Sequence, residues 1–389
     1  MSEWKKVKLG ELYEVHNGLS KGRQFFGSGY PFLTFSNVFN NWFLPEELES
    51  LVQSSEKERQ TCSIKKGDVF ITRTSETMDE LGMSSVALKD YPNATYNGFT
   101  KRLRPLTDEV IPEYIGYYLR SPKFRGKFMA FSTMTTRASL ANDDLLSMEV
   151  ELPDKITQQR IASTLSRYDS LIENYQKQIK LLEESAQRLY KEWFIDLRFP
   201  GHENTKIVNG VPEGWVKKTL DSFCNVFTGK KNANQGVSNG KYKFFTCGDT
   251  PLLINSYIYD GPAIIISGNG SYTGRTTFYK GKFDLYQRTY ACIMKDMQDE
   301  NLIYGLFEIV KCELTNKISG GTHGAAIPYI VMSDVTKFDF LYEENIMQRF
   351  SSIMHNILSE SLSLLNQIRH LTEARDRLLP KLMSGEIEV

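Results

Sequence analysis

The sequence is an internal duplication, and this constrains the fold more than any other feature. An N-terminal pattern that runs from Trp4 to Gly18 returns at a constant offset of 211 residues. Its members are Trp4, Leu9, Leu12, Val15 and Gly18, and they recur as Trp215, Leu220, Phe223, Val226 and Gly229. Farther along, Gln159-Arg160-Ile161 recurs as Gln348-Arg349-Phe350 at an offset of 189. The sequence therefore predicts two copies of a globular domain followed by a long helix, the first domain being about 22 residues longer.

Each copy ends in a long heptad pattern. Apolar residues recur alternately four and three apart, a period typical of a coiled-coil seam. The predicted seam residues are Ile161, Leu165, Ile172, Ile179, Leu182 and Leu189 in the first helix, and Phe350, Met354, Leu364, Ile368, Leu371 and Leu378 in the second. Ser361 and Arg375 interrupt the second seam with polar side chains. Residues 199–201 (Phe-Pro-Gly) and 384–385 (Ser-Gly) are predicted to end the two helices.

Two seams in one chain most simply pack against each other. A twofold-like arrangement of the two units would make the helices antiparallel. The alternatives are that each helix packs on its own domain or binds a partner. From Ile161 to Trp193 the first helix would rise about 48 Å, at about 1.5 Å per residue.

The globular parts combine short strands with a few helices. Residues 68–72 and 263–267 are predicted as strands, and 113–119 and 302–312 as helices. We therefore predict an α+β fold, with two mixed α/β globular domains joined by a long antiparallel coiled-coil helix pair in a pseudo-twofold duplication. The predicted boundaries are 1–155 for the first domain, 156–198 for the first helix, 199–214 for a linker, 215–342 for the second domain and 343–385 for the second helix.

Composition excludes several classes of protein. The chain has 389 residues, and its 47 Lys and Arg balance its 47 Asp and Glu. No apolar run approaches the roughly 18 residues that a membrane span needs, so no membrane partner is expected. The five cysteines form no close pair, which disfavours a disulfide framework and a thiolate zinc site and indicates a cytoplasmic protein. Zero net charge by itself weighs against a nucleic-acid partner.

The sequence offers no catalytic or metal-binding constellation. Residues 25–29 fit F-x-G-x-G but lack the companion motif of an amino-methyltransferase, and the glycine-rich residues 268–274 lack the G-K-[ST] of a P-loop. The five histidines show no H-x-x-x-H spacing. Glu3-Trp4-Lys5 has no upstream carboxylate to complete a nuclease metal site. We therefore predict no catalytic residue, no metal site and no cofactor in this chain.

Local basic segments predict a DNA-contact surface. Cations and hydroxyls without acids fill residues 120–141, the composition expected for contacts to phosphates and base edges, although a solvated loop and helix would look the same. The predicted contacts in the first domain are Lys21, Arg23, Thr72, Arg73, Arg120, Lys123, Arg125, Lys127, Thr135 and Arg137. Those in the second are Lys230, Lys231, Lys243, Asn269, Arg275, Thr322 and His323.

The ordered set of motifs resembles the specificity subunit of type I restriction-modification systems over essentially the whole chain. The motifs are Trp4-x4-Leu9-Gly10-Glu11-Leu12 with Gly18, Gly67-Asp68-Val69-Phe70-Ile71 before Thr72-Arg73-Thr74, Leu152-Pro153 before Gln159-Arg160-Ile161, Val211-Pro212-Glu213-Gly214-Trp215, and residues 377–387. One departure is that the family's usual acidic residue before the Gln is Gln158 in the first copy and Met347 in the second.

The resemblance implies a non-catalytic role in a multisubunit methyltransferase and endonuclease. Two target recognition domains would each read one half of a bipartite double-stranded DNA target, with the helices fixing the spacer. Two modification subunits would bind this chain and bring S-adenosylmethionine, and restriction subunits would bring ATP and Mg. Two other classes stay open from the residues alone, namely a two-domain scaffold for a non-DNA partner and a reduced methyltransferase or nuclease.

Overall fold

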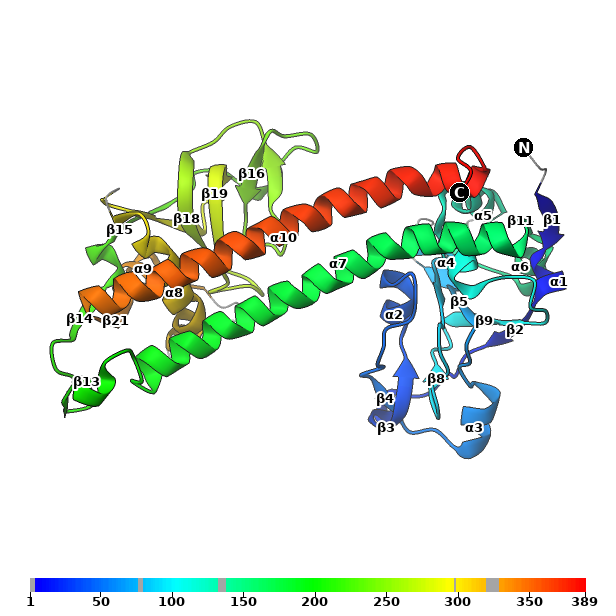
Figure 1. The fold of residues 1–389 in the computed structure, drawn as a ribbon, viewed down its shortest axis with the longest axis horizontal. Helices are drawn as coiled ribbons and strands as arrows, with labels where there is room; N and C mark the ends of the chain where they lie inside the picture. The colour runs from blue at the N-terminus through cyan, green and yellow to red at the C-terminus, as the bar shows by residue number, and fades with distance from the viewer. Residues whose placement is uncertain (1–3, 76–79, 132–137, 297–298, 320–328) are drawn as a thin grey trace. The chain divides into compact units, whose positions relative to one another are not determined.

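The computed structural model describes residues 4–75, 80–131, 138–296, 299–319 and 329–389. The chain divides into two compact units (Figure 1). The first consists of residues 1–174 and 368–389, and the second of residues 175–367. Each unit therefore holds one globular domain and a segment of each of two long helices, α7 (Lys155–Tyr190) and α10 (Glu344–Ser384).

The first unit is built on a four-stranded antiparallel sheet. Its order is β2 (Tyr13–Asn17), β9 (Thr100–Pro105), β5 (Val69–Thr72) and β7 (Ser84–Val86). The smaller sheets are β4 (Leu51–Val52) with β3 (Phe26–Leu33) and β8 (Thr95–Tyr96), β1 (Lys5–Lys8) with β11 (Glu149–Leu152), and β6 (Thr74–Ser75) with β10 (Ala138–Ser139). The helices are α1 (Leu9–Leu12), η1 (Arg23–Phe25), α2 (Phe35–Asn40), α3 (Glu56–Thr61), α4 (Pro112–Arg120), α5 (Pro122–Phe131) and α6 (Asn142–Ser147).

The second unit repeats this plan. Its sheet has the order β15 (Cys224–Thr228), β20 (Thr289–Met294), β18 (Tyr259–Ser267), β19 (Thr276–Leu285), β16 (Tyr242–Phe245) and β17 (Leu252–Ile254). Two further pairs are β14 (Val216–Thr219) with β21 (Asp339–Tyr342) and β12 (Ile207–Val208) with β13 (Val211–Pro212). Its helices are α8 (Leu302–Ser319) and α9 (Met332–Thr336), with short turns at Lys191–Ile195, His202–Asn204, Leu220–Ser222 and Ala233–Gln235.

Strand pairing shows that the duplication extends to the register. In the first unit Tyr13 pairs with Pro105 and Thr72 with Thr100, and in the second Cys224 pairs with Met294 and Ser267 with Thr289. Strands β2, β9, β5 and β7 thus correspond to β15, β20, β18 and β19. The offset between corresponding strands falls from 211 at β2 to 195 at the end of β5, so most of the extra residues of the first unit lie between these strands. This segment contains β3, β4, α2 and α3, which Figure 1 shows projecting from the first unit.

Alternating side chains of the central strands build two cores, one on each face of the sheet. In the first unit Val69 and Ile71 join a core with α4, α5 and the two long helices, while Phe70 faces a smaller core around α2. In the second unit Ile264 and Ile266 pack against α8 and the long helices, while Ile265 lies in the opposite core. The predicted α+β fold with a duplicated domain-plus-helix plan is confirmed.

The long helices pack against each other in the antiparallel sense. In the first unit Ile161 and Leu165, near the start of α7, share a core with Leu382, near the end of α10. In the second unit Trp193 lies just past the end of α7, and its ring centre is 5.8 Å from that of Phe350, near the start of α10. Every predicted seam residue is buried or half-buried, as a helix–helix seam requires. The boundaries predicted for the domains stay a prediction, because the two units divide each long helix between them.

The polar interruptions of the seam have local partners. Arg375 donates to the Asp169 carboxylate at 2.6 Å and lies 5.0 Å from the centre of the Trp42 ring. The hydroxyl of Tyr117 donates to the second oxygen of Asp169 at 2.5 Å. Ser361 donates to the carbonyl of Ile357, one turn earlier in α10. The charge of Arg375 in the seam is thus paired with a carboxylate and hydrogen-bonded.

The positions before the repeated Gln differ between the copies. Gln158 is buried, accepts from the backbone of Ile111 at 2.9 Å and donates to the carbonyls of Glu109 and Pro153. Met347 is buried in the apolar core of the second unit. Both residues are therefore structural, one through hydrogen bonds and the other through packing.

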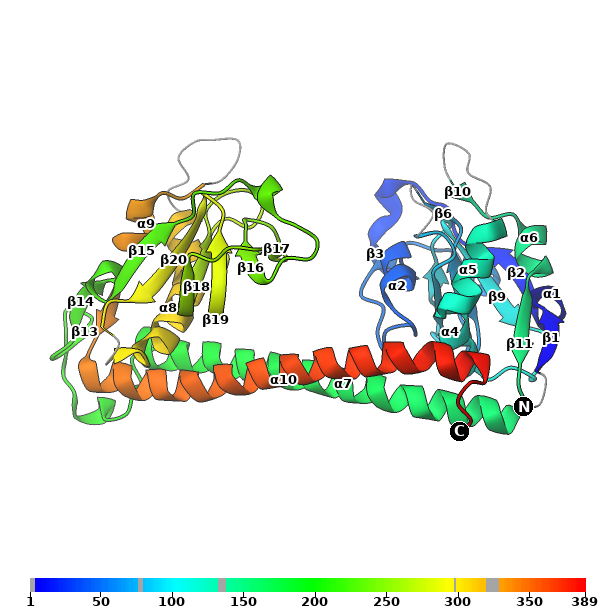
Figure 2. The ribbon, with the colours of Figure 1, turned by 90° about the horizontal axis from the view of Figure 1, so that it is seen from above.

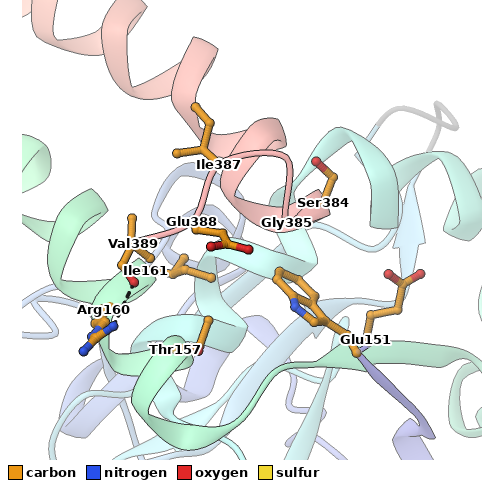
Figure 3. A pocket seen from close by; sticks show the side chains of 10 residues that line it. Glu151, Thr157, Arg160, Ile161, Ser384, Gly385, Ile387, Glu388 and Val389 are labelled. Carbon is orange, nitrogen blue, oxygen red and sulfur yellow. Dashed lines mark hydrogen bonds between the residues drawn. The ribbon is translucent and has the colours of Figure 1, made fainter. Parts of the chain in front are cut away.

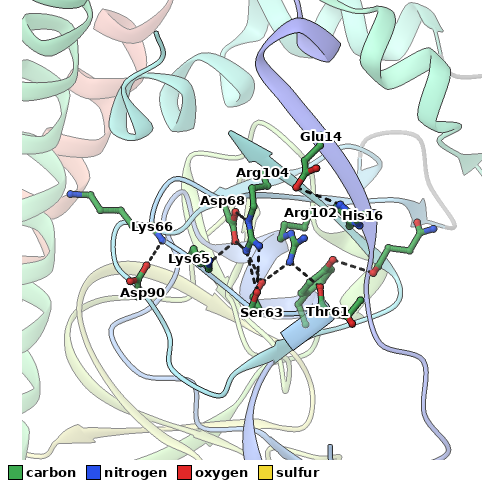
Figure 4. Close-up of polar contacts among 12 residues, drawn as sticks. Glu14, His16, Thr61, Ser63, Lys65, Lys66, Asp68, Asp90, Arg102 and Arg104 are labelled. Atoms are coloured by element: carbon green, nitrogen blue, oxygen red, sulfur yellow. Dashed lines mark hydrogen bonds and ion pairs between the residues drawn. The ribbon is translucent and has the colours of Figure 1, made fainter. Parts of the chain in front are cut away.

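A buried ion pair stabilises the first domain and is absent from its copy (Figure 4). Asp68, which is fully buried, accepts two hydrogen bonds from Arg104, at 2.9 and 2.7 Å. Arg104 also donates to the carbonyl of Ser63 at 3.0 Å. The strand register places Ala263 and Ile293 at the corresponding positions of the second unit, both within its apolar core.

This difference predicts a non-additive pair of substitutions. Arg104→Ile alone should destabilise the first domain by about 3–5 kcal/mol, because it leaves the Asp68 carboxylate buried and unpaired. Asp68→Ala with Arg104→Ile reproduces the apolar pair of the second unit and should recover most of that loss. Calorimetric unfolding of the wild type, the two single variants and the double variant measures this. Additive losses would show that the pair carries no special coupling.

Candidate nucleic-acid interface

In each unit, loops join the strands at one end of the main sheet, and we call this end the loop edge. In the first unit it is the edge where β2 and β5 end and where β9 and β7 begin. In the second unit it is the edge where β15 and β18 end and where β20 and β19 begin. Figure 2 shows that β6 and β10, which follow this edge in the first unit, lie at the end of that unit remote from α7 and α10.

The backbone of the loop edge has the same hydrogen bonds in both units. The amide of Arg73 donates to the carbonyl of Phe99 at 3.0 Å, and that of Gly268 donates to the carbonyl of Arg288 at 2.9 Å. The carbonyls of Arg73 and Gly268 in turn accept from Leu140 and Ile330, at 3.1 and 2.9 Å. A matching framework therefore carries different side chains in the two domains.

Three predicted contacts of the first domain lie at or near its loop edge. Arg73 is half-buried, and its guanidinium lies 3.5 Å from the side-chain oxygen of Asn17. Arg23 is exposed at the start of η1. Lys21 is paired with Glu58 at 2.8 Å and lies 5.0 Å from the Phe25 ring centre. Of these cations, Lys21 is neutralised within the domain.

Thr72 and Arg120 are structural residues. Thr72 is fully buried, donates to the carbonyl of Glu80 and accepts from the amide of Met83. Arg120 donates to the carbonyls of Ser84, Val38, Phe39 and Asn41, at 2.5 to 2.9 Å. Burial lowers the pKa of Arg120 to about 10, and the nearby Arg125 adds to this effect. In this structure each side chain forms its hydrogen bonds with backbone groups of the domain, so neither offers a free polar group, and their role as DNA contacts stays a prediction.

The basic residues of α5 also have partners within the domain. Glu151 on β11 accepts from Lys123 at 2.5 Å and from Lys127 at 3.2 Å. Arg125 donates to the carbonyl of Leu81 at 2.6 Å and lies 5.4 Å from the Phe128 ring centre. Residues 120–141 contain no acidic residue, but the fold brings Glu151, on a strand more than twenty residues later, next to α5. These three residues therefore do not form an unpaired phosphate-binding patch.

The second domain brings four of its predicted contacts to the loop edge. Lys230 is exposed two residues after β15, and Asn269 is half-buried two residues after β18, where it bridges to Tyr329. Arg275, just before β19, is exposed and donates to the Asp249 carboxylate at 2.5 Å. Lys231 donates to Ser256 at 2.8 Å and lies 3.5 Å from the buried Asp284. Lys243 is exposed on β16, away from this edge.

Four predicted contacts lie outside the residues that the structure describes. They are Thr135, Arg137, Thr322 and His323. Their prediction as DNA contacts therefore stays a prediction.

Sequence reasoning missed two residues of the loop edge. Phe99 precedes β9 and is 60% exposed, and Arg288 precedes β20 and is exposed. Neither residue lies in a cluster of basic or aromatic residues along the sequence, so composition does not single it out. The signal that could have found them is their offset of 189, the same as that of the repeated helices.

The described residues hold no group of His, Cys, Asp and Glu that could bind a metal ion. No helix within the described ranges has an apolar stretch long enough to cross a bilayer. What the loop edges offer is cations, amides, hydroxyls and an exposed ring, which are the groups that contact phosphates and base edges.

Comparison with known proteins identifies the family. The family model described as the type I restriction modification DNA specificity domain matches residues 1–184 and 212–353. The chain belongs to this family. The two matched segments correspond to the two copies of the internal duplication, so the family's domain occurs twice.

Individual relatives agree with this assignment. The chain is 27% identical to the type I restriction enzyme MjaIX specificity subunit of Methanocaldococcus jannaschii, over all of this chain and 94% of that protein. It is 30% identical to the EcoDI specificity subunit of Escherichia coli, over 46% of this chain and 39% of that protein. The fold is similar to that of the S subunit of a type I restriction-modification system from M. genitalium, with a TM-score of 0.61, 15% identity, and coverage of 97% and 96% of the two chains.

A cavity of about 400 Å³ lies in the first unit of this specificity subunit, where α7 begins and α10 ends (Figure 3). Trp4, Ile161 and Val389 line it, and Arg160 donates to the carbonyl of Val389 at 3.1 Å. In the second unit the Trp4 equivalent, Trp215, packs on Phe199 with ring centres 4.8 Å apart. The offset of 189 places Glu388 at the position of Phe199, so the first unit lacks the ring that fills this space in its copy.

The pairing of Glu151 predicts a stability effect that depends on pH. Burial raises the pKa of Glu151, but hydrogen bonds from Lys123 and Lys127 outweigh burial and leave it below the ordinary 4.5. A lowered carboxylate pKa stabilises the fold above 4.5, and this contribution is lost as the pH falls through the folded value. Lys123→Ala with Lys127→Ala should therefore lower the free energy of unfolding at pH 7 by about 1 kcal/mol. The difference from wild type should shrink in acid.

The same variant tests whether Lys123 and Lys127, which are paired with Glu151, also contact DNA. The salt dependence of DNA binding by the assembled complex should stay at the wild-type slope, because neither lysine neutralises a phosphate. Lys57→Ala, at an exposed position of α3, provides the matched control. A flatter salt slope with unchanged stability would restore Lys123 and Lys127 as DNA contacts.

Proposed function

We propose that this chain is the specificity subunit that directs a type I modification and restriction complex to a bipartite double-stranded DNA target. The globular domain of each unit reads one half-site through its loop edge. The long helices set the spacer between the half-sites, which neither domain reads. The boundaries proposed for these parts are those predicted from the sequence.

The observation that carries this proposal is the pair of matching loop edges with different side chains. The backbone hydrogen bonds at Arg73 and Gly268 are the same, so both domains present loops from one framework. The side chains at these edges differ, with Arg73, Asn17 and Phe99 in one domain and Asn269, Arg275 and Arg288 in the other. Two readers of unlike half-sites need this combination of a shared frame and divergent contacts.

Zero net charge is compatible with this role. Several cations of the first domain pair with carboxylates within it, namely Lys21 with Glu58, Arg104 with Asp68, and Lys123 and Lys127 with a shared Glu151. Non-specific DNA affinity depends on cations that are free to neutralise phosphates. We therefore expect the isolated chain to bind DNA weakly, and the complex to obtain most of its phosphate contacts from partner subunits.

Exposed apolar side chains on the long helices support a docking role. Leu171 and Leu181 on α7 are 45% and 61% exposed, and Leu362 and Leu365 on α10 are 42% and 51% exposed. Apolar residues repeated along an exposed helix face are typical of a surface that a protein partner covers. Two modification subunits, carrying S-adenosylmethionine, would bind here, and restriction subunits would add ATP- and Mg-dependent cleavage. This chain contributes recognition and no cofactor, in the cytoplasm.

Adenine methylation by the reconstituted complex tests the proposal. The chain with its modification subunits should methylate one bipartite sequence in a library of random duplexes. Removal of seven residues from the middle of both α7 and α10 keeps the seam in phase, because seven residues are two turns of its 3.5-residue repeat. The shortened complex should methylate the same two half-sites with a different spacer.

Two outcomes would contradict the proposal. Methylation without any sequence preference by the wild-type complex would remove the recognition role. A change of half-site sequence in the shortened complex, with the spacer kept, would refute the spacer role of the helices. Deletion of seven residues from α10 alone is the control for damage to the seam, and it should abolish activity.

A further inference from the structure

We propose that Phe99 and Arg288 are equivalent base-reading residues, and that the difference between them distinguishes the two half-sites. This inference rests on the proposed DNA-recognition function and specifies where in each loop edge the reading takes place. Neither residue belongs to a basic cluster or to a motif of the family pattern quoted above.

The backbone holds both residues in the same way. The amides of Thr100 and Thr289 donate to the carbonyls of Asn97 and Tyr286, three residues earlier, at 3.0 and 2.9 Å. These bonds close a tight turn with Phe99 or Arg288 as its third residue.

Two further hydrogen bonds fix that turn to its neighbours. In the first unit the amide of Gly98 donates to the carbonyl of Leu19 at 2.9 Å, and in the second the amide of Gln287 donates to that of Lys231 at 3.0 Å. The carbonyls of Phe99 and Arg288 then accept from the loops after β5 and β18. A turn held from both sides presents its side chain in a defined place, which sequence reading requires.

The two side chains project from these turns without an internal role. Phe99 is 60% exposed, the largest exposure of any aromatic ring among the described residues. Exposure of most of this ring to water costs free energy, and contact with an apolar surface would remove that cost. Arg288 is exposed, and its guanidinium has no hydrogen bond or ion pair within the described ranges. Both are available to a ligand.

Polar groups from neighbouring loops lie close to both turns. The backbone amide of Arg73 donates to the carbonyl of Phe99, and the Arg73 guanidinium lies 3.5 Å from the side-chain oxygen of Asn17. Beside Arg288 lies the loop from Gly268 to Arg275, whose ends are joined by a hydrogen bond from the amide of Ser267 to the carbonyl of Arg275. Polar groups around each residue can hold phosphates, while the central side chain reaches a base edge.

The chemistry of the two residues differs in a way that DNA distinguishes. A phenyl ring makes apolar contact with the methyl group of thymine or with an opened base step. A guanidinium donates two parallel hydrogen bonds to N7 and O6 of guanine. We expect Phe99 to favour a thymine-containing step in one half-site and Arg288 a guanine in the other.

Methylation of duplex libraries, each randomised in one half-site, tests the inference in the reconstituted complex with its modification subunits. Arg288→Ala should relax the preference at one position of one half-site by about 10-fold or more, the discrimination that a bidentate pair provides. Phe99→Ala should relax one position of the other half-site. Neither variant should alter the half-site read by the other domain.

Conservative variants separate base reading from general affinity. Arg288→Lys keeps the positive charge but cannot donate two parallel hydrogen bonds to guanine, so it should relax the guanine preference as Arg288→Ala does. Phe99→Leu keeps an apolar contact and should retain the preference. Lys218→Ala, an exposed position on β14, is the control for loss of surface charge.

Several results would overturn the inference. Unchanged preferences in Phe99→Ala and Arg288→Ala would exclude both residues from reading. Uniformly weaker methylation with the preference kept, or full rescue by Arg288→Lys, would make Arg288 a phosphate contact only. If the wild-type complex shows no preference in either library, the proposed function fails first. That result is distinct from a wild-type preference that the variants do not change.

Discussion

Apolar packing between α7 and α10 completes the core of both domains. Ile161 and Leu165 lie with Leu382 in the core of the first unit, and Tyr190 and Phe350 lie together in the core of the second. The core of each domain therefore includes residues from both long helices, one of which is continuous with the other domain in sequence. Because these residues are closely packed and buried, a substitution in one helix should change the stability of a domain that is distant along the chain. This constraint explains why the seam is conserved between the copies while the loops are not.

The two domains share a backbone framework and differ in the side chains that this framework carries. Asp68 and Arg104 form a buried ion pair that the second domain replaces with Ala263 and Ile293. The replacement costs little, because well-packed apolar residues are often as stable as a buried pair. The turn that carries Phe99 and Arg288 keeps its hydrogen bonds instead, while its side chain changes from apolar to cationic. Conservation of the frame with divergence of the contact is the pattern expected of two readers.

Periodicity and repetition could be predicted from the sequence, because they depend on local spacing. The seam from Ile161 to Leu189 and the corresponding strands that end at Thr72 and Ser267 are predicted on this basis alone. The contact residues could not be predicted in the same way. Lys123 and Lys127 look unpaired along the chain, and only the fold brings Glu151 to them. Arg120 looks like a surface cation, yet its guanidinium donates to four backbone carbonyls. Partners that are distant in sequence decide whether a charge is available.

Recognition of DNA by the two loop edges can be measured by hydrogen–deuterium exchange on the complex proposed for this chain with modification subunits. It compares the free complex with the complex bound to its target duplex. If the loop edges read DNA, target binding should protect residues 17–25, 97–100, 268–276 and 286–289 and leave strands β1 and β14, at the opposite ends of the domains, nearly unchanged. Protection confined to the long helices, or absent from either loop edge, would contradict recognition of DNA by matching edges of the two domains.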